Sequence, residues 1–187
     1  MISQLVRSAL CAGLLWASGR ALAVSFDPLS IEALSQQAEI ILQGTILSKT
    51  CLRDSAGRIY TRMELQVSDV WKGSISGSPF LLVHGGGILG DQEACVSGQV
   101  HYDPGEEVVA FLTRNQRGEG VTIGLAQGKF TIWKDRATGL KYAASVVHGV
   151  TEGRTGGAAP QNRAGQTRSA AGLELTRLKQ QVVEAAR

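Results

Sequence analysis

The sequence predicts a mostly β fold: a small antiparallel barrel or sandwich of six or seven strands, with a short helix before it and another helix after it. Three observations support this class. Short runs of branched aliphatic and aromatic residues recur along the chain, and clusters of Gly, Pro, Asn and Asp separate them. Helical spacing of apolar residues occurs only near the two ends. No segment of about 20 to 50 residues repeats, which excludes solenoids and propellers.

The first predicted element is a short helix over Pro28 to Ala38. Ser30 is a suitable N-cap because its hydroxyl can accept a hydrogen bond from a free backbone N–H of the first turn. Glu32 suits the positive end of the helix dipole.

Two strands and a tight turn are predicted next. Glu39 to Lys49 is rich in branched aliphatic residues, and Gly44 in its middle predicts a bulge or a sharp bend. Asp54 to Gly57 has turn composition. From Ile59 to Val67 apolar residues alternate with mostly polar ones, which predicts a strand with one buried face, and this strand extends to Trp71.

The remaining strands are shorter. We expect them at Pro79 to His84, Val108 to Thr113, Val121 to Ala126, Lys129 to Trp133 and Leu140 to Val147. A long glycine-containing loop and a tight turn at Asp103 to Gly105 are expected after the first of these, and a polar hairpin turn at Asn115 to Gly120.

The C-terminal part of the chain changes in character. Residues 149–169 contain mainly Gly, Thr, Arg, Ala, Asn and Gln, and such a segment buries too little apolar surface to offset its ordering entropy, so we expect a disordered linker. In residues 170–187, Leu175, Leu178 and Val182 recur at helical spacing. This predicts an amphipathic helix that docks either on the barrel or on a partner.

Residues 1–23 have the features of an export signal. Arg7 precedes an uncharged, mostly apolar run from Ser8 to Ala17, and Ala21 to Ala23 matches the small-x-small pattern of a cleavage site after Ala23. The run is shorter than the about 20 residues of a permanent membrane span. We therefore expect a periplasmic or secreted protein whose mature part, with the barrel domain at residues 24–148, has no membrane span.

The charge balance argues against a polyanionic partner. Loss of Arg7 and Arg20 with the signal lowers the formal net charge from +3 to about +1. Lys and Arg form no run in the sequence. A nucleic-acid partner is therefore not expected.

The cysteines predict a disulfide. Cys11 lies within the signal, which leaves Cys51 and Cys95 for the exported protein. In an oxidising compartment an isolated pair is most simply a disulfide, and closing a loop of about 45 residues stabilises the fold by about 4 kcal/mol. A redox or metal site is the alternative, but the sequence has no C-x-x-C and no histidine at ligand spacing from either cysteine.

Two motifs of the sequence resemble parts of catalytic sites. The string from His84 to Gly87 matches the oxyanion-hole sequence of some esterases, but no G-x-S-x-G nucleophile elbow occurs, which favours a flexible loop. Glu106 and Glu107 are adjacent on a turn, and acid–base work requires two carboxylates placed across a pocket. We expect no catalytic residues and no cofactor.

Two histidines and two acidic residues are candidate metal ligands. His84 and His101 could converge with Asp91 or Glu93, because one long segment joins them. Solvent-facing histidines at strand ends are the favoured interpretation, so no metal is expected.

Four sequence pieces carry a family resemblance. They are Gln37 to Thr45 (QAEIILQGT), Val70 to Gly73 (VWKG), Gly105 to Leu112 (GEEVVAFL) and Gly124 to Phe130 (GLAQGKF). The first three resemble netrin-type modules and tissue inhibitors of metalloproteinases, and the full set resembles secreted bacterial proteins with the same kind of barrel. The resemblance implies an OB-like barrel and a binding module.

The resemblance does not extend to the inhibitory mechanism. Those inhibitors begin at a cysteine whose amine and carbonyl reach the zinc of the protease, whereas the expected mature start here is Val24. No cysteine of the mature chain precedes Cys51.

We therefore expect an exported, non-enzymatic module that binds a protein partner, for example a secreted protease. The candidate surface is the loop that contains Gly85, Gly86, Gly87, Asp91 and Glu93. The alternative is a cell-envelope protein that binds glycan through Tyr60 or Trp133, or has a structural role. A metal-dependent hydrolase is a third, less favoured class.

Overall fold

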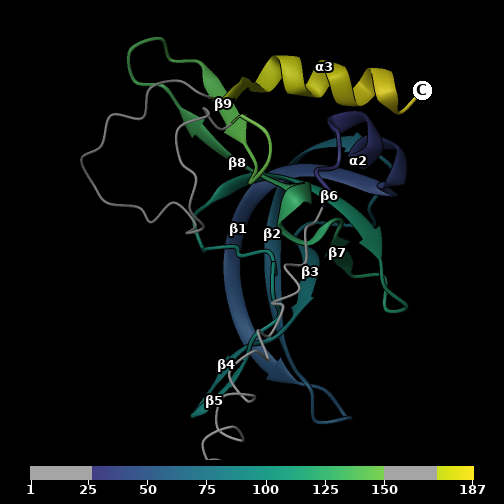
Figure 1. Cartoon of the computed structure of the whole chain (residues 1–187), viewed down its shortest axis with the longest axis vertical. Coiled ribbons are helices and arrows are strands. Elements are labelled where there is room, and N and C mark those ends of the chain that lie inside the picture. The colour runs from purple at the N-terminus through teal and green to yellow at the C-terminus, as the bar shows by residue number, and fades with distance from the viewer. Residues whose placement is uncertain (1–26, 150–171) are drawn as a thin grey trace, which may run out of the picture.

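The computed structural model describes residues 27–149 and 172–187 (Figure 1). The expected signal peptide with its cleavage site after Ala23 lies outside the described residues, as does the expected linker beyond residue 149. Within the described residues, no helix is long and apolar enough to span a membrane.

Five strands form a ring-like sheet. In ring order they are β1 (Ile40–Arg53), β2 (Ile59–Lys72), β3 (Phe80–Gly85), β7 (Gly120–Thr122) and β6 (Glu107–Arg114). The ring is continuous because β1 pairs with β2 along one edge and with β6 along the other. Neighbouring strands are antiparallel except for β3 and β7, which are parallel and meet at Leu82 and Gly120. The expectation of a purely antiparallel sheet is therefore wrong at this one junction.

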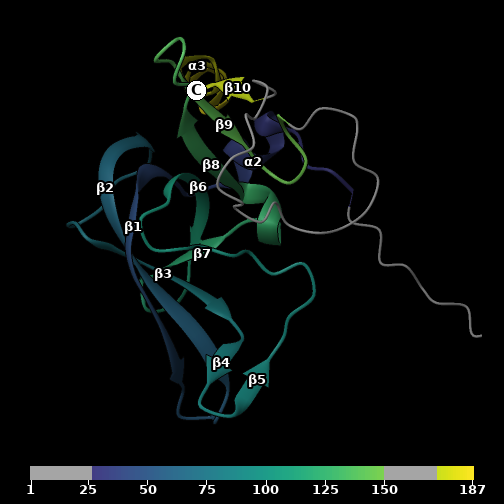
Figure 2. The same ribbon diagram turned by 90° about the vertical axis from the view of Figure 1, so that its left-hand side faces the viewer.

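The ring carries two extensions, which raise the number of strands above the predicted six or seven. From β6 the sheet continues through β8 (Lys129–Lys134), β9 (Lys141–Ala144) and β10 (Leu173–Glu174). A separate two-stranded ribbon of β4 (Gly87–Leu89) and β5 (Gln92–Ala94) occupies part of the segment predicted as a loop (Figure 2).

Part of one predicted strand is helical. The strand expected over Val121 to Ala126 ends early, and a 3₁₀ helix, η1 (Leu125–Gly128), follows β7. Gly124 and Leu125 have φ angles of 60° and 58°, which are incompatible with extended backbone. The N–H of Gln127 then donates to the Gly124 carbonyl at 3.1 Å and closes the turn.

The N-terminal helix begins where the sequence predicts. Helix α2 (Ile31–Gln37) is capped by Ser30, whose Oγ accepts a hydrogen bond from the N–H of Ala33 at 3.0 Å. At its other end the Lys72 ammonium donates to the Ser35 carbonyl at 2.7 Å, which fixes the helix against β2.

Gly44 marks a bend in β1. The pairing of β1 with β2 changes register between Gln43 and Gly44, as expected for a bulge. A Cβ at Gly44 would lie 2.3 Å from the Gln66 carbonyl oxygen, so only glycine permits the two strands to approach so closely here.

Apolar side chains form two cores on the two sides of β6. Val108, Ala110 and Leu112 belong to a core within the ring, and Val109 and Phe111 belong to a second core between the sheet and the helices. Because all five residues are completely buried, β6 has no solvent-facing side in this stretch.

The C-terminal helix completes the second core. Helix α3 (Leu175–Ala185) lies beside α2 at one end of the molecule (Figure 1), and its Leu178 and Val182 are fully buried. The ammonium of Lys179 forms an ion pair with Asp69 of β2 at 2.5 Å. Of the two expected positions for this helix, the structure therefore has the one docked on its own domain, and the apolar face is not free for a partner.

The docked position of α3 leads to a stability prediction. Leu178→Ala should lower the free energy of unfolding by about 2–5 kcal/mol, because the substitution leaves a cavity in the second core. Arg177→Ala, an exposed neighbour on the same helix, should change it by less than about 0.5 kcal/mol. Urea unfolding of both variants measures the difference, and equal midpoints would show that α3 does not contribute to the folded core.

Candidate functional site

A concave surface of the described residues forms an open groove of about 900 Å³. It is bordered by four segments, namely the β1–β2 turn, the end of β3, the end of β5 with the residues that follow it, and the β6–β7 turn. The β1–β2 turn lies at the end of the molecule opposite α3, so the groove and the helices are at different ends (Figure 1). Concave surfaces of this size are the usual location of binding sites.

The β1–β2 turn is organised by one carboxylate. Asp54 Oδ1 accepts hydrogen bonds from the N–H of Ala56 at 3.0 Å and of Arg58 at 2.9 Å. Gly57 adopts the required positive φ of 80°. These bonds to the charged carboxylate, with the backbone bond from Arg58 as the largest contribution, lower the pKa of Asp54.

The β6–β7 turn has the same design. Asn115 Oδ1 accepts from the N–H of Arg117 at 2.8 Å and of Glu119 at 3.0 Å, and Gly118 has a φ of 77°. Two turns that are far apart in sequence therefore repeat one pattern, an Asp or Asn followed three residues later by Gly, on two borders of the groove.

Each turn exposes an arginine and covers its carboxylate. Arg58 is 80% exposed while its partner Asp54 is 19% exposed, and their ion pair is 2.8 Å long. Arg117 is 57% exposed while Glu119 is 12% exposed, at 2.7 Å. The surface next to the groove is therefore rich in guanidinium groups.

A third arginine and a tyrosine complete this rim. Arg53 donates to the Gly57 carbonyl at 2.8 Å and also bonds the side chain of Gln92 on β5. The guanidinium of Arg117 lies over the ring of Tyr60, 5.4 Å from its centroid, in a cation–π arrangement.

Apolar side chains lie between the charged rims. Val83, Val96 and Val121 line the groove, and Val96 is 46% exposed. Ile88 of β4 is 66% exposed on the neighbouring ribbon. Exposed apolar surface bordered by arginine and tyrosine is typical of surfaces that bind macromolecules.

The predicted binding loop is divided by the structure. Gly85 and Gly86 line the groove, whereas Asp91 and Glu93 lie on the β4–β5 ribbon, exposed and outside the residues that line the groove.

The glycines of the segment for which the sequence predicts a flexible loop are closely packed. The Gly86 carbonyl accepts a hydrogen bond from the Thr61 hydroxyl at 2.8 Å, and a Cβ at Gly86 would lie 2.4 Å from the Ala94 carbonyl oxygen. A Cβ at Gly87 would lie 2.1 Å from Cys51 Sγ. The glycines are required because strands cross here without room for a side chain.

Both cysteines of the predicted disulfide are free thiols in the structure. Cys51 Sγ contacts the Thr61 hydroxyl at 3.3 Å, and Cys95 Sγ donates to Glu93 Oε1 at 3.1 Å, which raises the pKa of the Cys95 thiol. The segments that carry the two thiols are nevertheless neighbours in the fold. Cys51 Sγ packs on Gly87, Gly87 is paired with Ala94, and Cys95 is the next residue.

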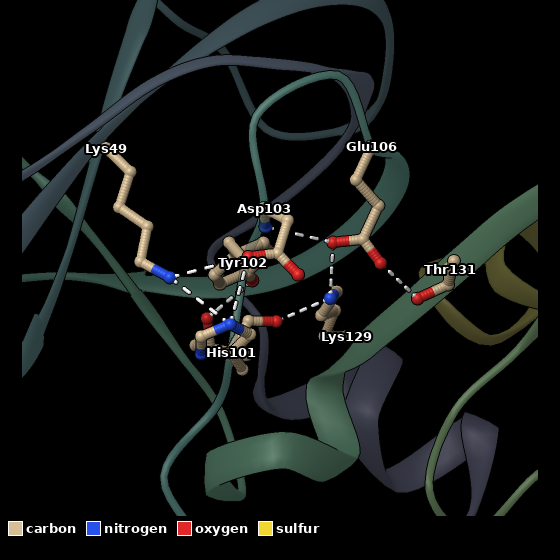
Figure 3. A network of polar contacts seen from close by, with 8 residues as sticks. Lys49, His101, Tyr102, Asp103, Glu106, Lys129 and Thr131 are labelled. Carbon is tan, nitrogen blue, oxygen red and sulfur yellow. Dashed lines mark hydrogen bonds and ion pairs between the residues drawn. The ribbon is translucent and has the colours of Figure 1, made fainter. Parts of the chain in front are cut away.

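The histidines of the possible metal site have other partners. His101 Nε2 lies 2.9 Å from the Asp103 carboxylate and 3.2 Å from the Lys49 ammonium (Figure 3). His84 Nδ1 lies 2.8 Å from the Gly85 carbonyl, to which it donates. In residues 27–149 and 172–187, no three or more His, Cys, Asp or Glu side chains are gathered as a metal site would need.

The adjacent glutamates have separate structural partners. Glu106 bonds the Lys129 ammonium at 2.6 Å and the Thr131 hydroxyl at 2.7 Å, so it holds the preceding turn against β8 (Figure 3). Glu107 accepts from Gln43 at 2.9 Å and from Lys141 at 2.8 Å. These contacts do not place the two carboxylates across a pocket.

Beneath that network lies a buried tyrosine. The ring of Tyr102 has no exposed surface and packs 5.0 Å from the Lys129 ammonium. Its hydroxyl bonds Thr122 Oγ1 at 2.8 Å, and burial raises its pKa. The network therefore serves to fix β8 and the 103–105 turn to the ring.

Only one of the two aromatic residues proposed for glycan binding borders the groove. Tyr60 lines it, whereas Trp133 stacks on Tyr142 at 6.2 Å in the β8–β9 extension.

Sequence comparison adds no relative to these observations. No protein-family model matches the chain, and a search of curated proteins finds no significant match.

The neighbouring positions of the segments that carry Cys51 and Cys95 lead to a redox prediction. A mild oxidant should join the two cysteines, because Cys51 packs against Gly87 of β4 and Cys95 directly follows Ala94, the β5 residue that pairs with Gly87. The intact mass should fall by that of two hydrogens, and unfolding should require more denaturant, since the cross-link restricts the unfolded chain. Cys51→Ser is the control and should show neither change. Alkylation of both thiols after treatment with the oxidant would contradict the prediction.

The environment of His84 leads to a pH prediction. Burial of the imidazole lowers the pKa of His84 below its ordinary 6.5, and nearby Lys49 and His101 act in the same direction. The unfolded chain then takes up a proton at higher pH than the folded one. The corresponding stability is complete above pH 6.5 and is lost as the pH falls from there to the lower pKa of the folded state.

Unfolding of the wild type and of His84→Gln between pH 7.5 and about 5 isolates this effect, because the other titrating groups are common to both. The wild type should lose more stability than the variant across this window. Parallel curves would show that His84 does not titrate differently in the two states.

Proposed function

We propose that the protein is an exported, non-enzymatic binding module that holds a protein partner in the groove bordered by the β1–β2 and β6–β7 turns. The observation that carries the proposal is this groove, in which apolar side chains, including the exposed Val96, lie between exposed arginines. Arginine and tyrosine are the residues that most often dominate protein-binding energies.

The order of the ring strands supports an OB-like barrel as the frame of this module. In chain order the five ring strands are β1, β2, β3, β6 and β7. The groove is bordered by the turn between the first and second of them, by the second and third strands, and by the turn between the fourth and fifth. These are the positions at which OB-fold proteins hold their ligands. The resemblance to netrin-type modules implies the same frame and a binding role.

The non-enzymatic part of the proposal rests on the partners of the reactive groups. Asp54, which is the groove's carboxylate, bonds Arg58 and two backbone N–H groups. Glu106 and His101 belong to the network beside β8. Each of these three side chains therefore has a structural partner within the fold.

Glycan is the second candidate, because Tyr60 lines the groove and aromatic rings stack on sugars. The guanidinium of Arg117, however, covers the Tyr60 ring at 5.4 Å, so a sugar would have to displace it. This contact favours a protein over a glycan.

Site-specific photo-crosslinking tests the proposal. Gln116 is an exposed groove residue, and Arg136 is an exposed residue of the β8–β9 turn, outside the groove lining. A benzophenone amino acid at position 116 should attach a defined protein in cell-envelope extracts, and one at position 136 should not. Equal products from both positions, no protein product, or a glycan adduct at position 116 would contradict the proposal.

A further inference from the structure

The two groove turns share a feature that points to the chemistry of the partner. In each, an acidic side chain is largely covered and satisfied within the turn, while the arginine bound to it stays exposed. The fold thus supplies the local counter-charge of each arginine without covering its outer face. Planar guanidinium groups in this situation are suited to carboxylates, which they bind with two parallel hydrogen bonds.

The groove as a whole has an excess of positive charge. Its lining residues include Arg53, Arg58 and Arg117 but a single carboxylate, Asp54. Between these groups lie Val83, Val96 and Val121. The surface therefore combines cationic borders with an apolar centre.

We infer that the segment of the partner that enters the groove is an extended peptide in which acidic residues flank an apolar one. The inference rests on the proposed function and names the chemistry of its partner. The apolar side chain covers the valines of the groove, of which Val96 is exposed, and the acidic side chains meet the arginines of the two turns. In an extended peptide, side chains at alternate positions project to the same side about 7 Å apart, so an apolar residue and the acidic residues two positions before and after it can all face the groove.

An acidic peptide explains the features better than a sugar or a nucleic acid does. A polyanion with charge along its whole length would leave the valines of the groove without apolar partners. It would also gain from a continuous basic face, whereas the arginines here alternate with covered acids.

Binding of a synthetic peptide by the mature protein tests the inference. The probe is a fluorescein-labelled peptide with an aspartate two positions before and another two positions after a central valine, and its matched control has asparagine at both of these positions. Anisotropy should show the aspartate peptide binding at least about tenfold more tightly, with the difference shrinking as salt is added.

Variants assign the effect to the groove. Arg58→Ala and Arg117→Ala should each weaken binding of the aspartate peptide by about fivefold, and Arg136→Ala, which removes the same charge from the β8–β9 turn, should not. Gln116→Glu and Gln116→Lys change the charge without touching any hydrogen bond of the turn. They should weaken and strengthen binding respectively, and they remain informative if an arginine variant fails to fold.

The inference is overturned if the two peptides bind alike, if neither binds, or if the Gln116 variants have equal affinities. It is also overturned if an oligogalacturonate or a single-stranded oligonucleotide binds and the peptides do not. Crosslinking from position 116 reports a protein in the groove whatever its charge. A crosslinked protein together with equal peptide affinities would therefore reject the acidic segment and leave the proposed function intact.

Discussion

Strand β6 is buried on both faces, and the rest of the fold is arranged around this requirement. Its sequence from Val108 to Leu112 has no polar side chain, so each face needs its own apolar cover. The closed ring covers one face, while α2, α3 and the β8–β9 extension cover the other. Burying one large aliphatic side chain contributes about 1.5–3 kcal/mol. The C-terminal helix is therefore a structural part of the domain, although a long segment of chain separates it from the remainder.

This arrangement places the groove at the opposite end of the ring from the helices. The groove is bordered by turns whose bonds are local, such as those of Asp54 and Asn115 to their own backbones. Neither turn contributes a residue to the two buried clusters. The core thus determines where the turns are held, and the turns determine what the groove presents.

The sequence predicts most of the fold because its signals are local. Alternation from Ile59 onward, the cap at Ser30 and the bend at Gly44 all follow from neighbours along the chain, and the structure confirms them. The β4–β5 ribbon escapes such reasoning because its first residue, Gly87, packs against Cys51, which is distant in sequence. The parallel contact of β3 with β7 and the groove itself depend on how distant strands meet. Asp54 and Asn115 are recognisable as turn residues, but no local pattern shows that their turns border one surface.

The repeated turn design has a consequence for how such a protein diversifies. The side chains of Ser55 and Gln116 make no hydrogen bond within the described structure, because the shape of each turn depends on the Asp or Asn before it and the Gly after it. Substitutions at these two positions leave folding almost unaffected while altering the chemistry at the rim. The two turns can therefore accept different side chains at these positions, by natural substitution or by design, with little effect on the stability of the ring.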